Sequence, residues 1–281
     1  MHEFFIAVLN HPFLQAALLT GLLASVACGI VGTYVTVRRI SYIAGAISHS
    51  TLGGMGVARY LERVVGITWI TPLYGAIAAA LLAALIIGLV SLYAKEREDS
   101  VLSMVWSLGM AIGILFIAKT PGNSEDLMSY LFGNILLVSP DDLWLIAGLD
   151  AVVVGCSVLC YNQLLAISFD EEYARLRGLR VAVYYLLLLG LTALTIVLLV
   201  QVVGVVLVIA LLTLPAATAA ALTKRLWQTM LVATLLTLAC TTGGLALSYG
   251  PDLPAGATII VLAGIVYLLV VLVPRRWRRR A

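Results

Sequence analysis

Charged side chains are scarce in this sequence. Asp, Glu, Lys and Arg make up only 11% of its 281 residues, whereas a soluble domain carries about 25%. Hydrophobic residues account for 62% of the chain, and the mean hydropathy is +1.09. A chain with so little polar surface does not have the composition of a soluble globular protein. The composition instead predicts a polytopic membrane protein that forms a single domain over residues 1–281.

Cysteine is nearly absent, and its positions give no disulfide framework. All four cysteines fall inside long apolar runs, at Cys28, Cys156, Cys160 and Cys240. Cys156 and Cys160 are four residues apart and would share one face of a helix. Such a pair could bind a soft metal ion, but the packing of small apolar side chains is the more ordinary explanation.

Several enzyme signatures are missing too. His2 and Glu3 lack the second histidine of a zinc-protease helix, and no Gly-x-Ser-x-Gly turn occurs. The stretch GILFIAKT at 113–120 has alanine where a phosphate-binding loop needs its second glycine. We therefore expect no catalytic residue, no permanently bound cofactor and no enzyme activity. The first residues also lack a basic region and a cleavage site, so we expect a retained external lead-in rather than a signal peptide.

Apolar runs fill most of the chain. A helix needs about 20 apolar residues to cross a bilayer, and nine runs approach that length, at about 13–37, 42–61, 69–93, 100–118, 142–165, 180–200, 202–222, 226–248 and 256–273. We expect an all-α fold with about nine transmembrane helices, with eight as the alternative. A tight turn at Gln201 to Gly204 should divide the region 181–222 into two helices. The segment 125–138 is too short to span comfortably and is expected to be a re-entrant or surface helix.

The basic residues indicate an orientation, because short cytoplasmic loops are rich in Lys and Arg. Nine spans with a cytoplasmic C-terminus put 14 of the 17 Lys and Arg inside, namely Arg38, Arg39, Lys95, Arg97, Arg175, Arg177, Arg180, Lys224, Arg225, Arg275, Arg276, Arg278, Arg279 and Arg280. Arg59, Arg63 and Lys119 would lie outside. The net charge of +3 therefore reflects topology and contact with lipid headgroups, and no nucleic-acid partner is expected.

A charged segment, FDEEYARLRG, interrupts the apolar runs at 169–178. Its apolar residues recur near helical spacing, and its acids precede its arginines, as the helix macrodipole favours. An ordinary solvated loop is the alternative. On the cytoplasmic side, such a helix would offer a surface to a soluble partner. The residues expected to form this surface are Phe169, Asp170, Glu171, Glu172, Tyr173, Ala174, Arg175, Arg177 and Gly178.

Two titratable residues, His49 and Asp150, lie inside predicted spans, where burial of a charge is costly. The neutral imidazole of His49 could bind a passing divalent cation, although a hydrogen bond to a neighbouring helix is the simpler explanation. Asp150 lies about 13 Å along a helix from Asp141 and could face either a polar cavity or a structural partner. Pro215 cannot donate a backbone proton, so the carbonyl of Leu211 should lose its helical partner.

Five blocks of sequence form a joint pattern. They are RRISYIAGAISHSTLGG at 38–54, DLMSYLFGNILLVSPDDL at 126–143, FDEEYARLRG at 169–178, VGVVLVIALLTLPAATA at 203–219 and TTGGLALSYGPDLPAG at 241–256. Read together, they resemble the ABC-3 permease family of bacterial zinc and manganese ABC importers, and most closely the zinc permeases. The blocks occur in the family's order and extend over nearly the whole chain.

The resemblance implies a homodimeric, multi-pass permease of the bacterial cytoplasmic (inner) membrane. Two cytosolic ABC ATPase subunits would drive it, and an extracytoplasmic metal-binding protein would supply the ion. Segment 169–178 would be the coupling helix that meets the ATPase. Zinc would be the first choice of substrate, with manganese or iron behind it. The rival is a gradient-driven transporter or channel without an ATPase, which would normally need more intramembrane ionisable groups than His49 and Asp150.

The chain departs from the family pattern at its second helix. In the family motif, written RRMSFIGDALSHA, an aspartate and a histidine four residues apart share a helix face as candidate metal ligands. His49 matches the histidine, whereas Gly45 stands at the aspartate position. Ser107 stands where some zinc permeases carry a histidine. His49 and Asp150 are therefore the candidate metal-contacting residues of this chain.

The predicted orientation can be tested by labelling. Cysteines introduced by Arg63→Cys and Arg278→Cys, in a variant without the four native cysteines, should react with a membrane-impermeant maleimide from opposite sides, because short cytoplasmic loops retain Lys and Arg. Arg63→Cys should label in intact cells and Arg278→Cys only after permeabilisation. Labelling of both positions in intact cells would contradict the nine-span topology.

Overall fold

The computed structural model of the protein describes residues 12–67, 69–93, 98–121, 133, 140–205, 207–251 and 253–272. Every regular element within these ranges is a helix, in agreement with the expected all-α fold. Hydrocarbon offers no hydrogen-bond partner, so apolar runs form helices, which satisfy their own backbone groups. The helices are α2 Pro12–Arg38, α3 Ser41–Tyr60, the π-helical turn η1 Leu61–Val65, α4 Pro72–Tyr93, α5 Glu98–Lys119, α7 Pro140–Leu159, α8 Tyr161–Phe169, α9 Glu171–Leu176, α10 Val181–Val203, α11 Val208–Leu222, α12 Leu226–Tyr249 and α13 Ala255–Leu272.

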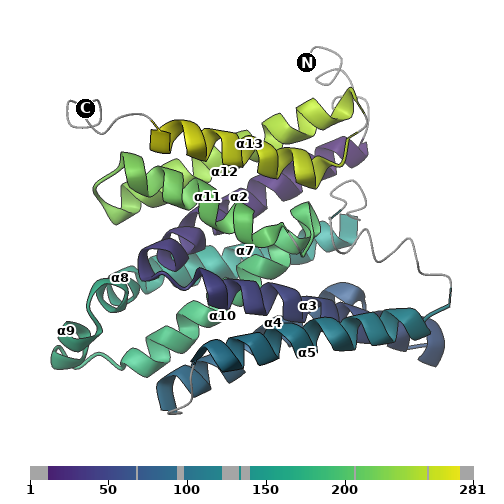
Figure 1. Cartoon of the computed structure of the whole chain (residues 1–281), viewed down its shortest axis with the longest axis horizontal. Coiled ribbons are helices and arrows are strands. Elements are labelled where there is room, and N and C mark those ends of the chain that lie inside the picture. Colours follow the sequence, from purple (N-terminus) through teal and green to yellow (C-terminus); the bar gives the residue numbers. More distant parts are fainter. Residues whose placement is uncertain are drawn as a thin grey trace.

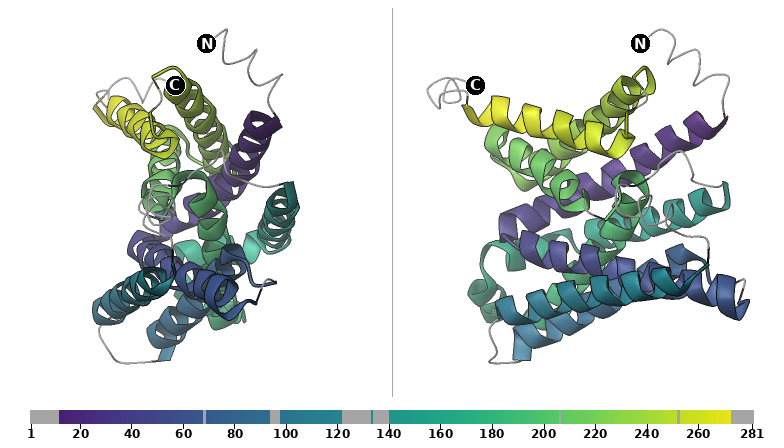
Figure 2. Two further views of the ribbon diagram at one scale, coloured as in Figure 1. Left: turned by 90° about the vertical axis from the view of Figure 1, so that its right-hand side faces the viewer. Right: turned by 45° about the vertical axis from the view of Figure 1, so that its right-hand side comes forward.

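The long helices run back and forth along the long axis of the molecule (Figures 1 and 2). Six of those described, α2, α4, α5, α10, α12 and α13, are long and apolar enough to cross a membrane, and the bent pair α7–α8 would be a seventh. The other two predicted spans correspond to α3, which carries several Ser and Thr residues and a His, and to α11, which has only 15 residues. Length and composition therefore do not confirm the count of about nine.

The predicted span 142–165 is not one straight helix. The chain bends by 73° between α7 and α8, at Cys160. Helix α8 buries Leu164 and Ile167 against the bundle and exposes Asn162 and Phe169.

The run 181–222 does divide into two helices, as expected. α10 continues through the predicted turn and ends at Val203, and α11 begins at Val208. Between them, Gly204 has φ 77° and ψ 166°, a backbone conformation that is essentially restricted to glycine. The glycine rather than Gln201 thus fixes the break. The predicted segment 125–138 lies outside the described residues except for Gly133, whose backbone lies directly against Gly204.

Helix α3 is held between α4 and α5 by contacts between glycines. A Cβ atom placed on Gly53 would lie 2.8 Å from the carbonyl oxygen of Gly109 on α5. A Cβ on Gly54 would clash with the carbonyl oxygen of Gly75 on α4. Small residues at helix contacts let two backbones approach closely in a membrane. These contacts fix the rotation of α3 and therefore the direction of its polar side chains.

Pro215 lies inside α11, and the carbonyl that it leaves free has found another partner. The thiol of Cys28 on α2 donates to the oxygen of Leu211 at 3.2 Å. Thr237 on α12 donates in turn to the Cys28 sulfur at 3.8 Å. The loss of the helical hydrogen bond was predicted from the proline, and the structure shows that a buried cysteine compensates for it. Cys28 thus serves helix packing.

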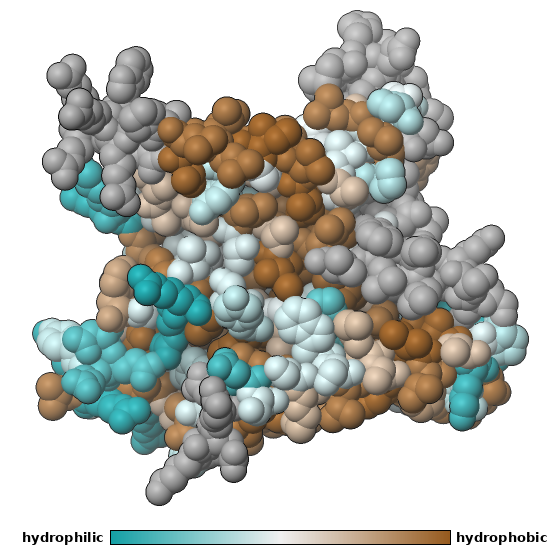
Figure 3. Space-filling view, viewed as in Figure 1, coloured by the Kyte–Doolittle hydropathy of each residue, from teal (hydrophilic) through white to brown (hydrophobic). Residues whose placement is uncertain are grey.

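The short helix α9 projects at the left-hand end of the molecule in Figure 1, and the last turn of α13 lies at the same end. Figure 3 shows hydrophilic residues gathered around the region of α9, and hydrophobic residues over α13. The predicted coupling segment and the end of α13 thus lie on the same side of the bundle. The predicted orientation requires these two parts to lie on the same side of the membrane. That this side is the cytoplasmic one stays a prediction.

Candidate functional site

His49 lies halfway along α3 and is only 9% exposed. Its ring stacks on Trp106 of α5, with centroids 4.2 Å apart and planes 15° from parallel. Its Nδ1 atom is buried and has no hydrogen-bond partner among the described residues. A histidine that served packing alone would normally satisfy both nitrogens. The free nitrogen leaves a lone pair or a proton available to a visiting ligand.

The residue before His49 ties α3 to the break between α10 and α11. Ser48 donates its hydroxyl to the carbonyl oxygen of Val205 at 2.8 Å. Gly133 lies against the same break, beside Gly204. Irregular backbone at mid-bundle is tolerated where protein or a water-filled path satisfies it, and transporters use such breaks to contact their substrates. The middle of α3 therefore lies beside irregular backbone.

The space around Gly45, one turn before His49, is occupied by apolar side chains. A Cβ atom on Gly45 would lie 3.0 Å from Cδ1 of Ile209 and 3.3 Å from the Trp106 ring. The carboxylate of the family motif is thus absent, and Ile209 and Trp106 fill its surroundings. Ser107, at the other departure from the motif, is exposed and donates to the carbonyl oxygen of Ser103 on its own helix.

Asp150 lies on α7, on a different helix from His49. It is 7% exposed on α7, and its Oδ1 atom has no partner in the described part of the chain. Helix α7 packs mainly against α2, α8 and α10, whereas His49 faces α5. No group of three or more His, Cys, Asp or Glu side chains that could hold a metal ion occurs among the residues described. Within one chain, the structure does not join the two candidates into a site.

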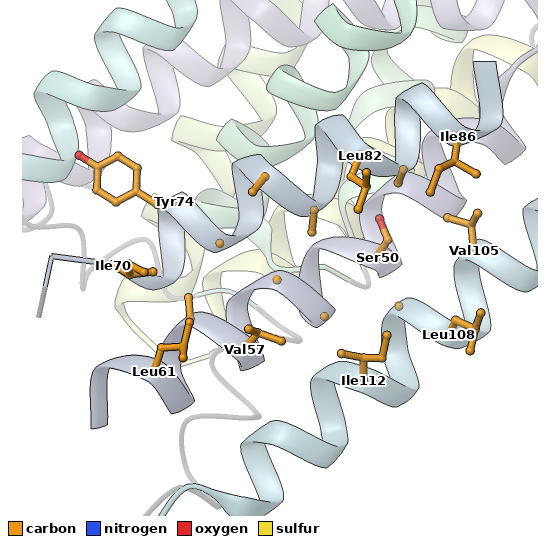
Figure 4. Close-up of a pocket in the computed structure, with 18 of the residues that line it drawn as sticks. Ser50, Val57, Leu61, Ile70, Tyr74, Leu82, Ile86, Val105, Leu108 and Ile112 are labelled. Atoms are coloured by element: carbon orange, nitrogen blue, oxygen red, sulfur yellow. The ribbon is translucent and has the colours of Figure 1, made fainter. Parts of the chain in front are cut away.

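A groove between α3, α4 and α5 has a volume of about 630 Å³, and none of the described residues that line it is charged. We call it the α3–α5 groove. Figure 4 shows Leu82 and Ile86 of α4 on one side, Leu108 and Ile112 of α5 on the other, and Ser50 of α3 between them. Such a surface suits hydrocarbon and offers almost nothing to a hydrated cation. It does not contribute to the candidate site.

The predicted amphipathic helix within 169–178 is present as α9, and both of its ends are capped. The side chain of Asp170 accepts a hydrogen bond from the backbone N–H of Tyr173 at 2.9 Å. At the other end, Gly178 has φ 77°, and the N–H groups of Gly178 and Leu179 donate to the carbonyls of Arg175 and Ala174. This is a Schellman motif. Residues within the segment therefore define both ends of this short helix.

Arg38, at the end of α2, anchors α9 to the bundle. Its guanidinium donates to the carbonyl oxygen of Ile167 at 2.7 Å, pairs with the carboxylate of Glu171 and lies 4.6 Å from the ring centre of Tyr185 on α10. Ala174 is fully buried on the same side of α9. Glu171 is thus occupied within the chain, although the sequence analysis assigned it to a partner surface.

The outward face of α9 remains available. On α9, Leu176 is 87% exposed and Tyr173 is also exposed, and Phe169 at the end of α8 is 67% exposed. Arg177 lies over the Tyr173 ring, 5.2 Å from its centre. An exposed apolar cluster flanked by charge is the surface expected of a helix that docks in a groove of another protein.

Below α9 is a second hollow, with a volume of about 450 Å³. We call it the α9 hollow. It lies between the α2–α3 turn, the end of α4, α8, α9 and the start of α10, and its charged lining residues are Arg38, Arg39, Glu171 and Arg175. Sequence analysis assigned Arg175 to partner contact and did not identify the hollow, because Arg38 and Glu171 are 133 residues apart.

The sequence is similar to those of known transport proteins. The sequence profile of the ABC 3 transport family matches residues 10–274. A Chlamydia trachomatis protein named "Probable metal transport system membrane protein" is 43% identical over 266 residues, which cover 95% of this chain and 90% of that one. The "Manganese transport system membrane protein MntC" of Halalkalibacterium halodurans is 33% identical over 95% of this chain and 89% of its own length.

A solved structure is also similar. The structure titled "PsaBC from Streptococcus pneumoniae in complex with Fab" superposes with a TM-score of 0.87 and 31% sequence identity. The match covers 99% of this chain and 97% of that one. The similarity therefore extends over the candidate site and α9 alike.

The anchor of α9 can be tested by hydrogen exchange. Glu171→Gln removes the charge that pairs with Arg38 and should loosen α9 by about 1 kcal/mol, which is an upper figure for a partly exposed ion pair. Amides of 171–176 should then exchange roughly fivefold faster in mass spectrometry of the protein in nanodiscs. Glu172→Gln, on the exposed side, is the matched control and should change nothing. Equal exchange in both variants would contradict the anchor.

Proposed function

The chain belongs to the ABC 3 transport family, and we propose that it is the membrane permease of an ATP-driven importer of a divalent metal ion. The observation that carries the proposal is the similarity over the whole chain, candidate site included, to named metal transport proteins and to PsaBC. The rival, a gradient-driven transporter without an ATPase, has no comparable support. No covalent chemistry is assigned to the permease, since ATP hydrolysis would occur in a separate chain.

Manganese is the ion that we propose first, with zinc as the alternative. The preference for zinc from the sequence is not confirmed, and two of the relatives, from Halalkalibacterium halodurans and Streptococcus parasanguinis, are named for manganese. Zinc sites usually gather three or four nitrogen or sulfur ligands, whereas Mn²⁺ suits oxygen ligands and water. The residues next to His49 in the sequence, Ser48 and Ser50, carry hydroxyls that donate to the carbonyl oxygens of Val205 and Ile47. Their oxygen atoms favour an ion that accepts oxygen ligands and keeps part of its water shell.

The partners follow from the same proposal. Cytosolic ABC ATPase subunits would bind the exposed side chains of Tyr173 and Leu176 on α9 and of Phe169 at the end of α8. An extracytoplasmic metal-binding protein would deliver the ion at the opposite end of the bundle. A second copy of the permease would complete a homodimer, and His49 of each copy would then contribute to the ion path. The isolated chain offers a single imidazole, which makes a weak site that binds only in passing.

The function is tested by uptake. A strain that lacks its own copy of this permease should accumulate radiolabelled Mn²⁺ when the permease is restored together with its ATPase, and Zn²⁺ and Fe²⁺ more slowly. Replacement of the phosphate-binding lysine of the ATPase should abolish accumulation, since that lysine holds the nucleotide phosphates. Accumulation that persists in that variant would favour the gradient-driven rival. Accumulation of zinc alone would overturn the choice of metal but not the class of transporter.

The role of His49 needs variants whose packing is matched. His49→Ala should reduce uptake about tenfold or more, because the loss of a group that supports metal binding costs at least that much. Gly45→Asp should tighten metal binding by adding a carboxylate one turn away. Gly45→Ala is its control, because a Cβ there already presses on Ile209, whose flexible end can move. Normal uptake by His49→Ala at equal protein level would remove His49 from the path.

A further inference from the structure

The α9 hollow contains more positive charge than the anchoring of α9 requires. Three arginines and one glutamate line it, namely Arg38, Arg39, Arg175 and Glu171. Arg38 is already satisfied by Glu171, by the Ile167 carbonyl and by the Tyr185 ring. Arg39 and Arg175 form no ion pair with any described residue. Within the described part of the chain, the hollow therefore has a surplus of two positive charges.

Arg39 occupies a backbone position that normally belongs to glycine. Helix α2 ends in a Schellman motif, in which Arg39 N–H donates to Thr36 and Ile40 N–H donates to Val35. Arg39 stands at the left-handed position with φ 59°, and no other non-glycine residue that is described has a positive φ. A non-glycine side chain costs about 1 kcal/mol there. The side chain of Arg39 lines the α9 hollow, although its backbone conformation favours glycine.

The rest of the lining includes both hydroxyl-bearing and apolar residues. The hydroxyl of Tyr185 donates to that of Ser91, and the hydroxyl of Ser168 donates to the carbonyl oxygen of Leu164. Ile43 and Leu92 are among the apolar residues. The natural occupant of such a hollow combines an anionic group that accepts hydrogen bonds with an apolar part. A divalent metal cation would be repelled, so the hollow is not an exit for the transported ion.

Two exposed tyrosines beside the hollow support a position at the level of the lipid headgroups. Tyr42, in the first turn of α3, is 79% exposed, and Tyr93, the last residue of α4, is 74% exposed. Both helix ends border the hollow through their neighbours Ile43 and Leu92. Exposed tyrosines at the ends of spanning helices mark the depth of the headgroups, because their rings are apolar and their hydroxyls polar.

We propose that the α9 hollow binds the phosphate group of an anionic phospholipid, with Arg39 and Arg175 as its ligands. Guanidinium groups bind phosphate oxygens through paired N–H donors, and basic pockets between helices on the cytoplasmic side hold lipid headgroups. The glycerol and first methylene groups lie against Ile43 and Leu92. The proposal does not depend on which ion the protein carries or on whether an ATPase drives it.

A bound headgroup would add a contact between two elements that Arg38 and Glu171 already link. Arg39 belongs to the α2–α3 turn and Arg175 to α9. A phosphate between them would add a second link beside the pair of Arg38 and Glu171. Anionic lipid would therefore stiffen the attachment of α9 to the bundle. The lipid composition of the membrane would then influence how strongly a movement of a docked partner is transmitted through α9.

Native mass spectrometry of the full-length protein tests the site. Wild type released from micelles that contain phosphatidylglycerol and phosphatidylcholine in equal amounts should retain one phosphatidylglycerol per chain. Arg39→Gln and Arg175→Gln should each weaken this retention about fivefold, since a basic residue near the surface contributes about that much to anionic lipid binding. Arg177→Gln, in which the lost side chain lies over Tyr173 on the outer face, is the matched control and should retain the lipid.

A second variant separates lipid binding from folding. Arg39→Gly removes the side chain but suits the left-handed backbone, so it should keep or raise the melting temperature and still lose the lipid. Retention of phosphatidylglycerol by Arg39→Gly and Arg175→Gln at the wild-type level would overturn the proposal. So would equal retention of the two lipids by wild type, which would indicate the α3–α5 groove instead.

Two further measurements with the same protein identify the source of the bound anion. Inorganic phosphate at millimolar concentration should not displace the lipid, because it lacks the apolar part. Displacement would assign the hollow to free phosphate and contradict the lipid proposal. Addition of the ATPase should leave the lipid in place. Release of lipid on ATPase binding, together with loss of that binding in Arg39→Gln, would assign the arginines to an acidic side chain of the partner and overturn the proposal.

Discussion

The arrangement of the bundle around α9 depends on the contacts of the Arg38 guanidinium group. This group links the end of α2 to the carbonyl of Ile167 on α8, to Glu171 on α9 and to the ring of Tyr185 on α10. A helix of six residues has too few internal hydrogen bonds to be stable by itself. The caps at Asp170 and Gly178 define its ends, and Arg38 fixes where it stands. A force applied to α9 therefore reaches the long helices α2 and α10 and the short helix α8.

A second constraint acts at the middle of the bundle. The glycine contacts of α3 with α4 and α5 allow no side chain larger than hydrogen at Gly53 or Gly54, so α3 has little freedom to rotate. His49 and Ser48 then face Trp106 and the α10–α11 break. The candidate path and the proposed coupling helix α9 are held by different means, backbone contact in one case and a charged side chain in the other.

The sequence predicted well those features that depend on short stretches of chain. The acid-to-base order of 169–178, with Asp170 just before α9 and Gly178 just after its C-cap, is sufficient for a capped helix, and Pro215 indicated a freed carbonyl. The features that it missed depend on tertiary contact. The bend at Cys160 and the pairing of Arg38 with Glu171 leave no periodic signal. The short α11 and the polar α3 also show why hydropathy alone does not give the number of spans.

The central claim is that α9 presents its outer face to an ATPase. Co-purification of the ATPase with tagged permease tests it most directly. Leu176→Asp places a charge at the most exposed apolar position of α9 and should weaken recovery about thirtyfold, since loss of a hot-spot contact costs about 2 kcal/mol. Leu253→Asp, also exposed and located just before α13, is the matched control and should recover the ATPase like wild type. Equal recovery by Leu176→Asp and wild type would contradict the account.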